Sequence, residues 1–215
     1  GIAVIEGLHD LEYGEIVLFD SGIKGMAQDI RTDGTTGIIL FGSDSELTEG
    51  ARVVRTRRTA GIPISNKILG RMIDPLGNTI DGGEPLTAQE YFPVERPAPG
   101  ILERKSVSRP METGILALDA MFPIGRGQRE LLIGDRQTGK TSIAVDTILN
   151  QKGKNVICVY VAIGQKASTV TKVVGILQRA GAMAYTVVVS SSASDPASLQ
   201  YIAPYAGCAV AEYFM

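Results

Sequence analysis

A glycine-rich stretch in the second half of the chain has the residue types and spacing of a phosphate-binding loop. Residues 134–141 read Gly-Asp-Arg-Gln-Thr-Gly-Lys-Thr and fit the pattern G-x-x-x-x-G-K-[ST] at every required position. Glycines at these positions let successive backbone N–H groups turn toward an anion at the start of a helix. Lys140 can reach the β- and γ-phosphates, and the Thr141 hydroxyl can ligate Mg²⁺. The pattern therefore predicts a site for ATP or ADP with Mg²⁺.

A second candidate position follows an apolar run further along the chain. Gln165 comes after the run 155–163, and the carboxyl end of a parallel strand faces the crevice in which ligands bind. A glutamate there could polarise an attacking water, whereas the amide of Gln165 cannot take up a proton. Some GTPases nevertheless position water with a glutamine. Gln165 is therefore a candidate contact to the nucleotide and is not assigned as a catalytic base.

The residues around the loop predict the elements that hold it. Residues 129–133, which read Arg-Glu-Leu-Leu-Ile, predict a strand that runs into the loop, and residues 140–150 predict the helix that follows. The further predicted elements are a strand over 155–163, a helix over 168–180 with Val170, Val173, Val174 and Leu177 on one face, a strand over 185–189, and a helix with Asp195 as its N-cap and Pro196 at its first position. This alternation predicts a mostly parallel sheet with right-handed crossovers.

The N-terminal part of the chain has a different pattern. Apolar runs at 14–19 and 37–41 and an alternating segment at 51–56 are separated by Gly and Asp turns, which favours a small β-barrel or sandwich. Residues 60–112 contain seven of the ten prolines and predict an extended connector. The predicted domains are a β-barrel over 1–59, a connector with the start of the nucleotide-binding domain over 60–112, and an α/β P-loop domain over 113–215. Because the chain begins with Gly1 and ends inside an apolar pattern, we expect it to be truncated at both ends.

Charge and composition exclude several other classes of protein. The 21 Lys and Arg residues nearly balance the 23 Asp and Glu residues, which argues against electrostatic binding of nucleic acid by the whole chain. The basic cluster 55–58 contains no aromatic residue that could stack on bases, so we interpret it as solvated surface. Arg126 and Arg129 are interpreted in the same way. Two cysteines and the single histidine His9 argue against a disulfide scaffold or a structural zinc site.

Residues 123–141 resemble the α subunits of F-type (F1Fo) ATP synthases. The resemblance continues at 22–26 in the barrel region, at 96–100 and 110–114 before the loop, and at 159–166 and 199–205 after it. It implies a RecA-like nucleotide-binding domain in which Gln137 and Thr138 contribute backbone groups and Ser142 touches the α-phosphate. The nucleotide-binding residues are then Gly134, Asp135, Arg136, Gln137, Thr138, Gly139, Lys140, Thr141, Ser142 and Gln165, with Thr141 as the metal ligand and no catalytic residue.

The same resemblance implies a place in a larger assembly. Members of this family alternate with β subunits in an α3β3 ring around the central stalk γ, and the ring is held by the peripheral stalk with δ and joined indirectly to the membrane Fo sector. The β subunits make and break ATP, whereas the α subunits hold Mg-ATP at non-catalytic sites. We therefore expect a non-catalytic ATP-binding subunit of a proton-translocating ATP synthase. Its place would be the cytoplasmic face of a bacterial plasma membrane or the stromal face of a thylakoid membrane, with no nucleic-acid partner.

Two other functions remain open from the sequence. A catalytic ring ATPase of the same plan, such as an RNA helicase or a secretion ATPase, predicts a carboxylate near position 165 and, for a helicase, a basic barrel. This chain has Gln165 and a net charge of −2. A small-molecule kinase would give no role to the N-terminal β region and the long connector.

Overall fold

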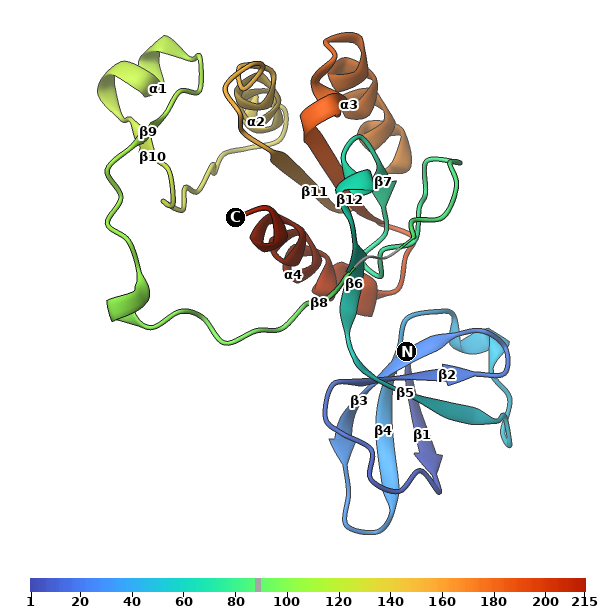
Figure 1. Ribbon diagram of the computed structural model, residues 1–215. Coiled ribbons are helices and arrows are strands. Elements are labelled where there is room, and N and C mark those ends of the chain that lie inside the picture. The colour runs from blue at the N-terminus through green and yellow to red at the C-terminus, as the bar shows by residue number, and fades with distance from the viewer. Residues whose placement is uncertain (88–89) are drawn as a thin grey trace.

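Five strands at the N-terminus pair into an antiparallel sheet in the order β1-β4-β3-β2-β5. They are β1 (Ile2–Glu6), β2 (Glu15–Phe19), β3 (Lys24–Ile30), β4 (Thr35–Leu40) and β5 (Val53–Thr59), in a computed structural model that describes residues 1–87 and 90–215 (Figure 1). Val17, Ala27 and Ile38 have no exposed surface and lie in the core of this sheet. The predictions of β2, β4 and β5 are confirmed. Neither β1 nor β3 was predicted from the sequence. In β3, glycine and polar residues interrupt the apolar alternation.

The proline-rich segment forms short strands and supplies side chains to the core of the α/β domain. β6 (Gly61–Ile64) pairs with β8 (Glu90–Pro93), and the two-residue strand β7 (Met72–Ile73) runs parallel to β12 (Thr186–Ser192). Ile62 and Ile64 have no exposed surface and share one cluster with residues of β12. This segment therefore supplies strands and core side chains to the α/β layer. The domain boundaries at 59/60 and 112/113 stay predictions.

Two parallel strands lie between two layers of helices, as the alternation of elements predicts. β11 (Cys158–Gln165) pairs in parallel with β12. Helices α2 (Lys140–Leu149) and α3 (Ala167–Arg179) pack on one face of these strands, and α4 (Ala197–Phe214) packs on the other. The four residues expected on the inner face of α3, namely Val170, Val173, Val174 and Leu177, are all buried. The predicted alternation of strands and helices is thus present after residue 140.

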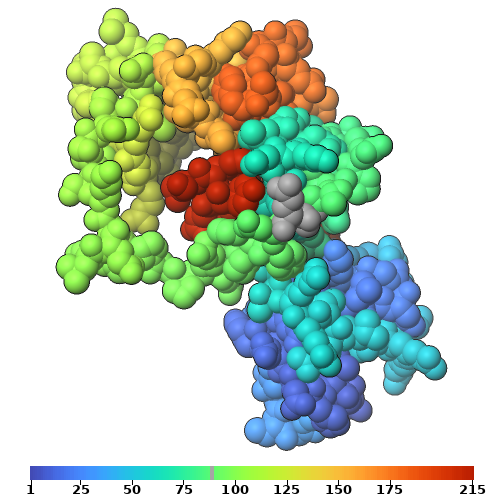
Figure 2. Space-filling view, viewed as in Figure 1, coloured from blue at the N-terminus to red at the C-terminus, as the bar shows by residue number. Residues whose placement is uncertain are grey.

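The segment that leads to the phosphate loop lies apart from the sheet. It carries a short 3-10 turn (Ile101–Glu103), the paired strands β9 (Pro110–Met111) and β10 (Ile124–Gly125), and helix α1 (Leu116–Met121). Figure 2 shows an opening between this segment and α4. The prediction of a strand over 129–133 is wrong for this structure, in which Leu131 and Ile133 are 76% and 86% exposed. The run pairs with none of the described strands, and the edge of β11 that faces away from β12 stays unpaired among the described residues.

The start of α4 also differs from the expectation. Pro196 occupies the N-cap position, and the Asp195 carboxylate does not cap the helix. It instead accepts a hydrogen bond from the backbone N–H of Ser192 at 2.6 Å and from the Ser192 hydroxyl at 2.9 Å. Asp195 therefore closes the turn that follows β12, because its carboxylate satisfies backbone groups behind it in sequence.

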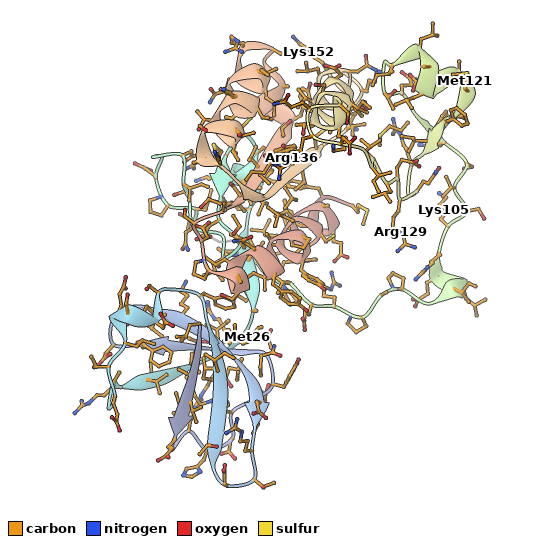
Figure 3. All side chains as sticks on the ribbon, turned by 180° about the vertical axis from the view of Figure 1, so that it is seen from behind. Met26, Lys105, Met121, Arg129, Arg136 and Lys152 are labelled. Carbon is orange, nitrogen blue, oxygen red and sulfur yellow. The ribbon has the colours of Figure 1, made fainter. Side chains whose placement is uncertain are left out.

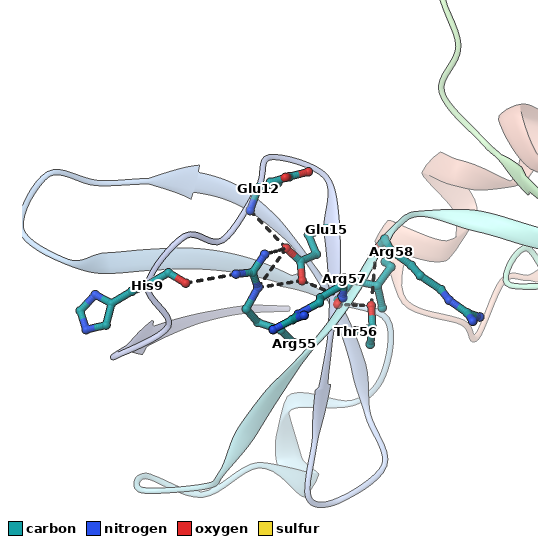
Figure 4. Close-up of polar contacts among 8 residues, drawn as sticks. His9, Glu12, Glu15, Arg55, Thr56, Arg57 and Arg58 are labelled. Atoms are coloured by element: carbon teal, nitrogen blue, oxygen red, sulfur yellow. Dashed lines mark hydrogen bonds and ion pairs between the residues drawn. The ribbon is translucent and has the colours of Figure 1, made fainter.

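The basic cluster 55–58 is partly tied into the N-terminal sheet: Arg55 and Thr56 are half-buried, whereas Arg57 and Arg58 are exposed, as the prediction of a solvated surface expects. The Arg55 guanidinium donates to the buried carboxylate of Glu15 at 2.6 Å and to the carbonyl oxygen of His9 at 3.2 Å (Figure 4). The backbone N–H groups of Glu12 and Arg57 donate to the same carboxylate. The guanidinium of Arg58 lies 5.6 Å from the centre of the Tyr91 ring. These residues hold the sheet together and join it to β8.

Protonation of Glu15 is expected to weaken the fold. The hydrogen bonds from Arg55 lower the pKa of Glu15 below its usual value, so its stabilising effect is complete above about pH 4.3 and is lost as the pH falls through the folded-state pKa. Glu15→Gln should lower the free energy of unfolding at neutral pH by about 1–3 kcal/mol and flatten its dependence on acid. Urea unfolding at neutral and acidic pH measures both effects, with the exposed Glu46→Gln as control. An equal acid dependence in the two variants would contradict the prediction.

Candidate functional site

The glycine-rich loop turns directly into helix α2. Gly139 has a φ of +92° and occupies the N-cap position of α2, and Gln137 has a φ of +61°. A side chain at Gly139 would be strained in this left-handed region, so glycine is what lets the chain reverse there. The first N–H groups of a helix lack partners within the helix and carry its positive end. The loop therefore ends at a point where backbone donors and positive potential gather.

Lys140 lies across the loop that precedes it. Its ammonium group donates to the carbonyl oxygen of Gly134 at 2.6 Å and to that of Asp135. The Thr138 hydroxyl donates to the same Asp135 carbonyl at 2.9 Å. Residues 134–138 are exposed and Lys140 is half-buried. The loop therefore surrounds the ammonium group of Lys140, and the exposed residues of the loop leave that group accessible to an anion from solvent.

The position of α2 fixes the place of the loop in the α/β layer. Val145 and Ile148 are buried in one cluster with Ala162 of β11 and with the inner face of α3. The Tyr185 hydroxyl, directly before β12, donates to the carbonyl oxygen of Ile148 at 3.0 Å, so the C-terminal end of α2 lies at the amino ends of these strands and its N-terminus points toward their carboxyl ends. The loop and the end of β11 therefore share the edge at which ligands bind in open α/β sheets.

The chemistry of the loop fits a magnesium ion that comes with a nucleotide. Among residues 1–87 and 90–215, no group of three or more His, Cys, Asp or Glu side chains could hold a metal ion. The exposed Thr141 hydroxyl is a hard oxygen donor at the start of α2. Magnesium takes one or two protein oxygens and completes its shell with phosphate oxygens and water. A metal at this site would therefore depend on Thr141 and on the phosphates of the ligand.

The other candidate residues are distributed around this loop. Gln165 is the last residue of β11 and is half-buried. Ser142 follows Thr141 on the first turn of α2 and is exposed, as is Arg136. Arg129 lies out on the leading segment, apart from the sheet (Figure 3). The assignment of the loop residues and Gln165 to nucleotide binding stays a prediction.

Sequence reasoning missed the polar residues that surround the end of β11. The Gln200 amide donates to the carbonyl oxygen of Asp195 at 3.1 Å, and the backbone N–H of Ala193 donates to the carbonyl oxygen of Gln165 at 3.1 Å. The run of serines after β12 and the Asp195-Pro196 pair were the available signals. They indicated a turn and a helix start, but they did not indicate which strand the turn would contact.

An antiparallel β domain, a parallel α/β layer and a glycine-rich loop that opens a helix define a P-loop nucleotide-binding protein. Residues 1–57 match the beta-barrel domain of the ATP synthase alpha/beta family, and residues 114–215 match the nucleotide-binding domain of the same family. The chain belongs to the ATP synthase alpha/beta family. Its fold is accordingly a β-barrel domain followed by a RecA-like nucleotide-binding domain, as the sequence predicts.

Two curated relatives match the whole chain. The chain is 56% identical over 215 residues to the ATP synthase subunit alpha of Acetivibrio thermocellus and to that of Caldanaerobacter subterraneus subsp. tengcongensis. The matched region is 100% of this chain and 42% of each relative. The chain therefore spans less than half the length of these relatives.

Within the described residues, every helix is too short or too polar to traverse a lipid bilayer.

Proposed function

We propose that the intact protein is the non-catalytic, ATP-binding subunit of the F1 sector of an ATP synthase. The observation that carries this proposal is the combination of a complete phosphate loop with Gln165 at the end of β11. The loop supplies Lys140, the helix start and the Thr141 hydroxyl for a nucleotide with Mg²⁺. The amide of Gln165 cannot accept a proton from an attacking water, as a carboxylate at this position could, so the chain supplies no general base there and we expect the site to hold nucleotide without fast cleavage.

The partners and place of the protein follow from the same proposal. The relatives are named as subunits of an ATP synthase, so we infer a complex with the other F1 subunits. The proposed arrangement is an alternating ring with β subunits around the central stalk γ, held by the peripheral stalk with δ, and joined indirectly to the membrane Fo sector. The proposed location is the cytoplasmic face of a bacterial plasma membrane, on which such a complex makes ATP from ADP and phosphate with an ion gradient.

A paired assay on the intact protein, purified alone, tests the proposal. Bound Mg-ATP and released phosphate are measured in the same sample over time. We expect nucleotide to be retained with negligible release of phosphate, because the chain lacks a carboxylate at position 165. Sustained turnover by the lone chain would overturn the proposal and favour a catalytic ring ATPase such as a helicase or a secretion ATPase. Absence of bound nucleotide would overturn the assignment of the loop.

A further inference from the structure

The two faces of β11 pack against different helices. Cys158, Tyr160 and Ala162 contact the cluster formed with α2 and α3, whereas Val159 and Val161 contact the cluster formed with α4. Successive residues of a strand point to opposite faces of a sheet. Continued without interruption, this alternation would place residue 164 on the face of α2 and Gln165 on the face of α4.

A one-residue bulge interrupts this alternation immediately before Gln165. Ile163 is paired with Ser191, and Gln165 is paired with Ser192, so Gly164 has no place in the ladder. Ser192 lies on the same face of β12 as Val188, which packs with α2 and α3. Because residues paired across parallel strands share a face, Gln165 lies on the face of α2, from which the phosphate loop opens.

Gly164 and the start of α4 shape this bulge. Gly164 has a φ of +63°, which strains any residue with a side chain. A Cβ atom at Gly164 would lie 3.1 Å from the side-chain oxygen of Gln200. The amide nitrogen of Gln200 in turn donates a hydrogen bond to the carbonyl oxygen of Asp195 at 3.1 Å. The Gln200 side chain on the first turn of α4 therefore lies against the bulge and is held there by the carbonyl oxygen of Asp195, two residues before the helix begins.

We propose that the Gly164 bulge turns Gln165 toward the phosphate loop, and that Gln200 is a positioning residue that keeps the bulge in register. The inference rests on the proposed function, because it assumes that the loop holds a nucleotide. Gln200 touches no ligand in this scheme and acts through the direction of Gln165. Sequence patterns cannot reveal this link, since it depends on a shift of one residue in a strand.

Equilibrium binding of Mg-ATP to the intact protein tests the inference through a double-mutant cycle. Gln165→Ala and Gln200→Ala are each expected to weaken binding by about three- to tenfold, the value of one lost hydrogen bond. The double variant should bind as weakly as Gln165→Ala alone, because Gln200 acts only through Gln165. The inference would be overturned if the losses of binding free energy in the two single variants added in full in the double variant. It would also be overturned if Gln200→Ala bound Mg-ATP as tightly as the unaltered protein.

Further variants separate this inference from a loss of folding and from a failure of the proposed function. Gly164→Ala should weaken binding in the same direction as Gln165→Ala, and the exposed Gln178→Ala on α3 should leave binding unchanged. Urea midpoints identify variants that fail to fold. If Lys140→Ala weakens binding while the cycle is additive, only this inference fails. If Lys140→Ala leaves binding unchanged, the proposed function fails.

Discussion

Replacing Lys140 with alanine is expected to weaken binding of Mg-ATP to the intact protein by about tenfold or more. The ammonium group is the cation held inside the curve of the loop, where it is bonded to the carbonyl oxygens of Gly134 and Asp135. A bound nucleotide would replace these oxygens with charged phosphate oxygens, and such charge-assisted bonds are about twice as strong as neutral ones. Equilibrium titration with Mg-ATP measures the loss directly.

Lys152 provides the matched control for this experiment. It carries the same charge on the same stretch of chain, but it is exposed in the turn after α2, at the far end of the helix from the loop. Lys152→Ala should therefore bind Mg-ATP as the unaltered protein does. Equal affinities for both variants and the unaltered protein would mean that the loop does not hold phosphate.

Replacing Ile62 with alanine is expected to lower the free energy of unfolding by about 2–5 kcal/mol. Ile62 lies on β6 and has no exposed surface, and it shares a core cluster with Val187 and Val189 of β12. Removing its side chain would leave a cavity between the proline-rich segment and the α/β layer. Urea unfolding followed by circular dichroism measures the change.

Ile101→Ala is the control for the loss of Ile62, because the same side chain is removed from a residue that is 86% exposed. It should change the free energy of unfolding by no more than about 0.5 kcal/mol. A similar small change for Ile62→Ala would mean that residues 61–94 unfold independently of the α/β layer. The comparison therefore also tests where the second domain begins.

Local chemistry made the phosphate loop and the third helix predictable. The loop is defined by residue types at fixed spacing, and its turn into α2 needs only Gly139 and the helix that follows. The helix over 167–179 has its apolar residues on one face, and those residues are the ones it buries. In both cases the signal lies within one short stretch of chain, so no knowledge of distant contacts was required.

Features that depend on distant partners could not be predicted. Residues 129–133 end in three apolar residues and were predicted as a strand, yet a strand also needs a neighbour, and the sequence does not state which one. The strand β7 has only two residues and exists because β12 offers its edge. The hydrogen bonds between Arg55 and Glu15 join residues forty positions apart, so the pairing of one arginine of the basic cluster with a buried carboxylate could not be predicted. The bulge at Gly164 could not be predicted either, because it depends on how β11 pairs with β12.

The position of Lys140 also bears on the exchange of hydrogen-bond partners that the proposed binding of a nucleotide requires. Because its ammonium already has two carbonyl partners, an arriving anion must displace protein oxygens before it gains the charge. A triphosphate offers many oxygens at once and can complete this exchange, whereas chloride replaces the two bonds poorly. In the proposed function, binding of a nucleotide would therefore exchange the neutral carbonyl partners of Lys140 for charged phosphate oxygens.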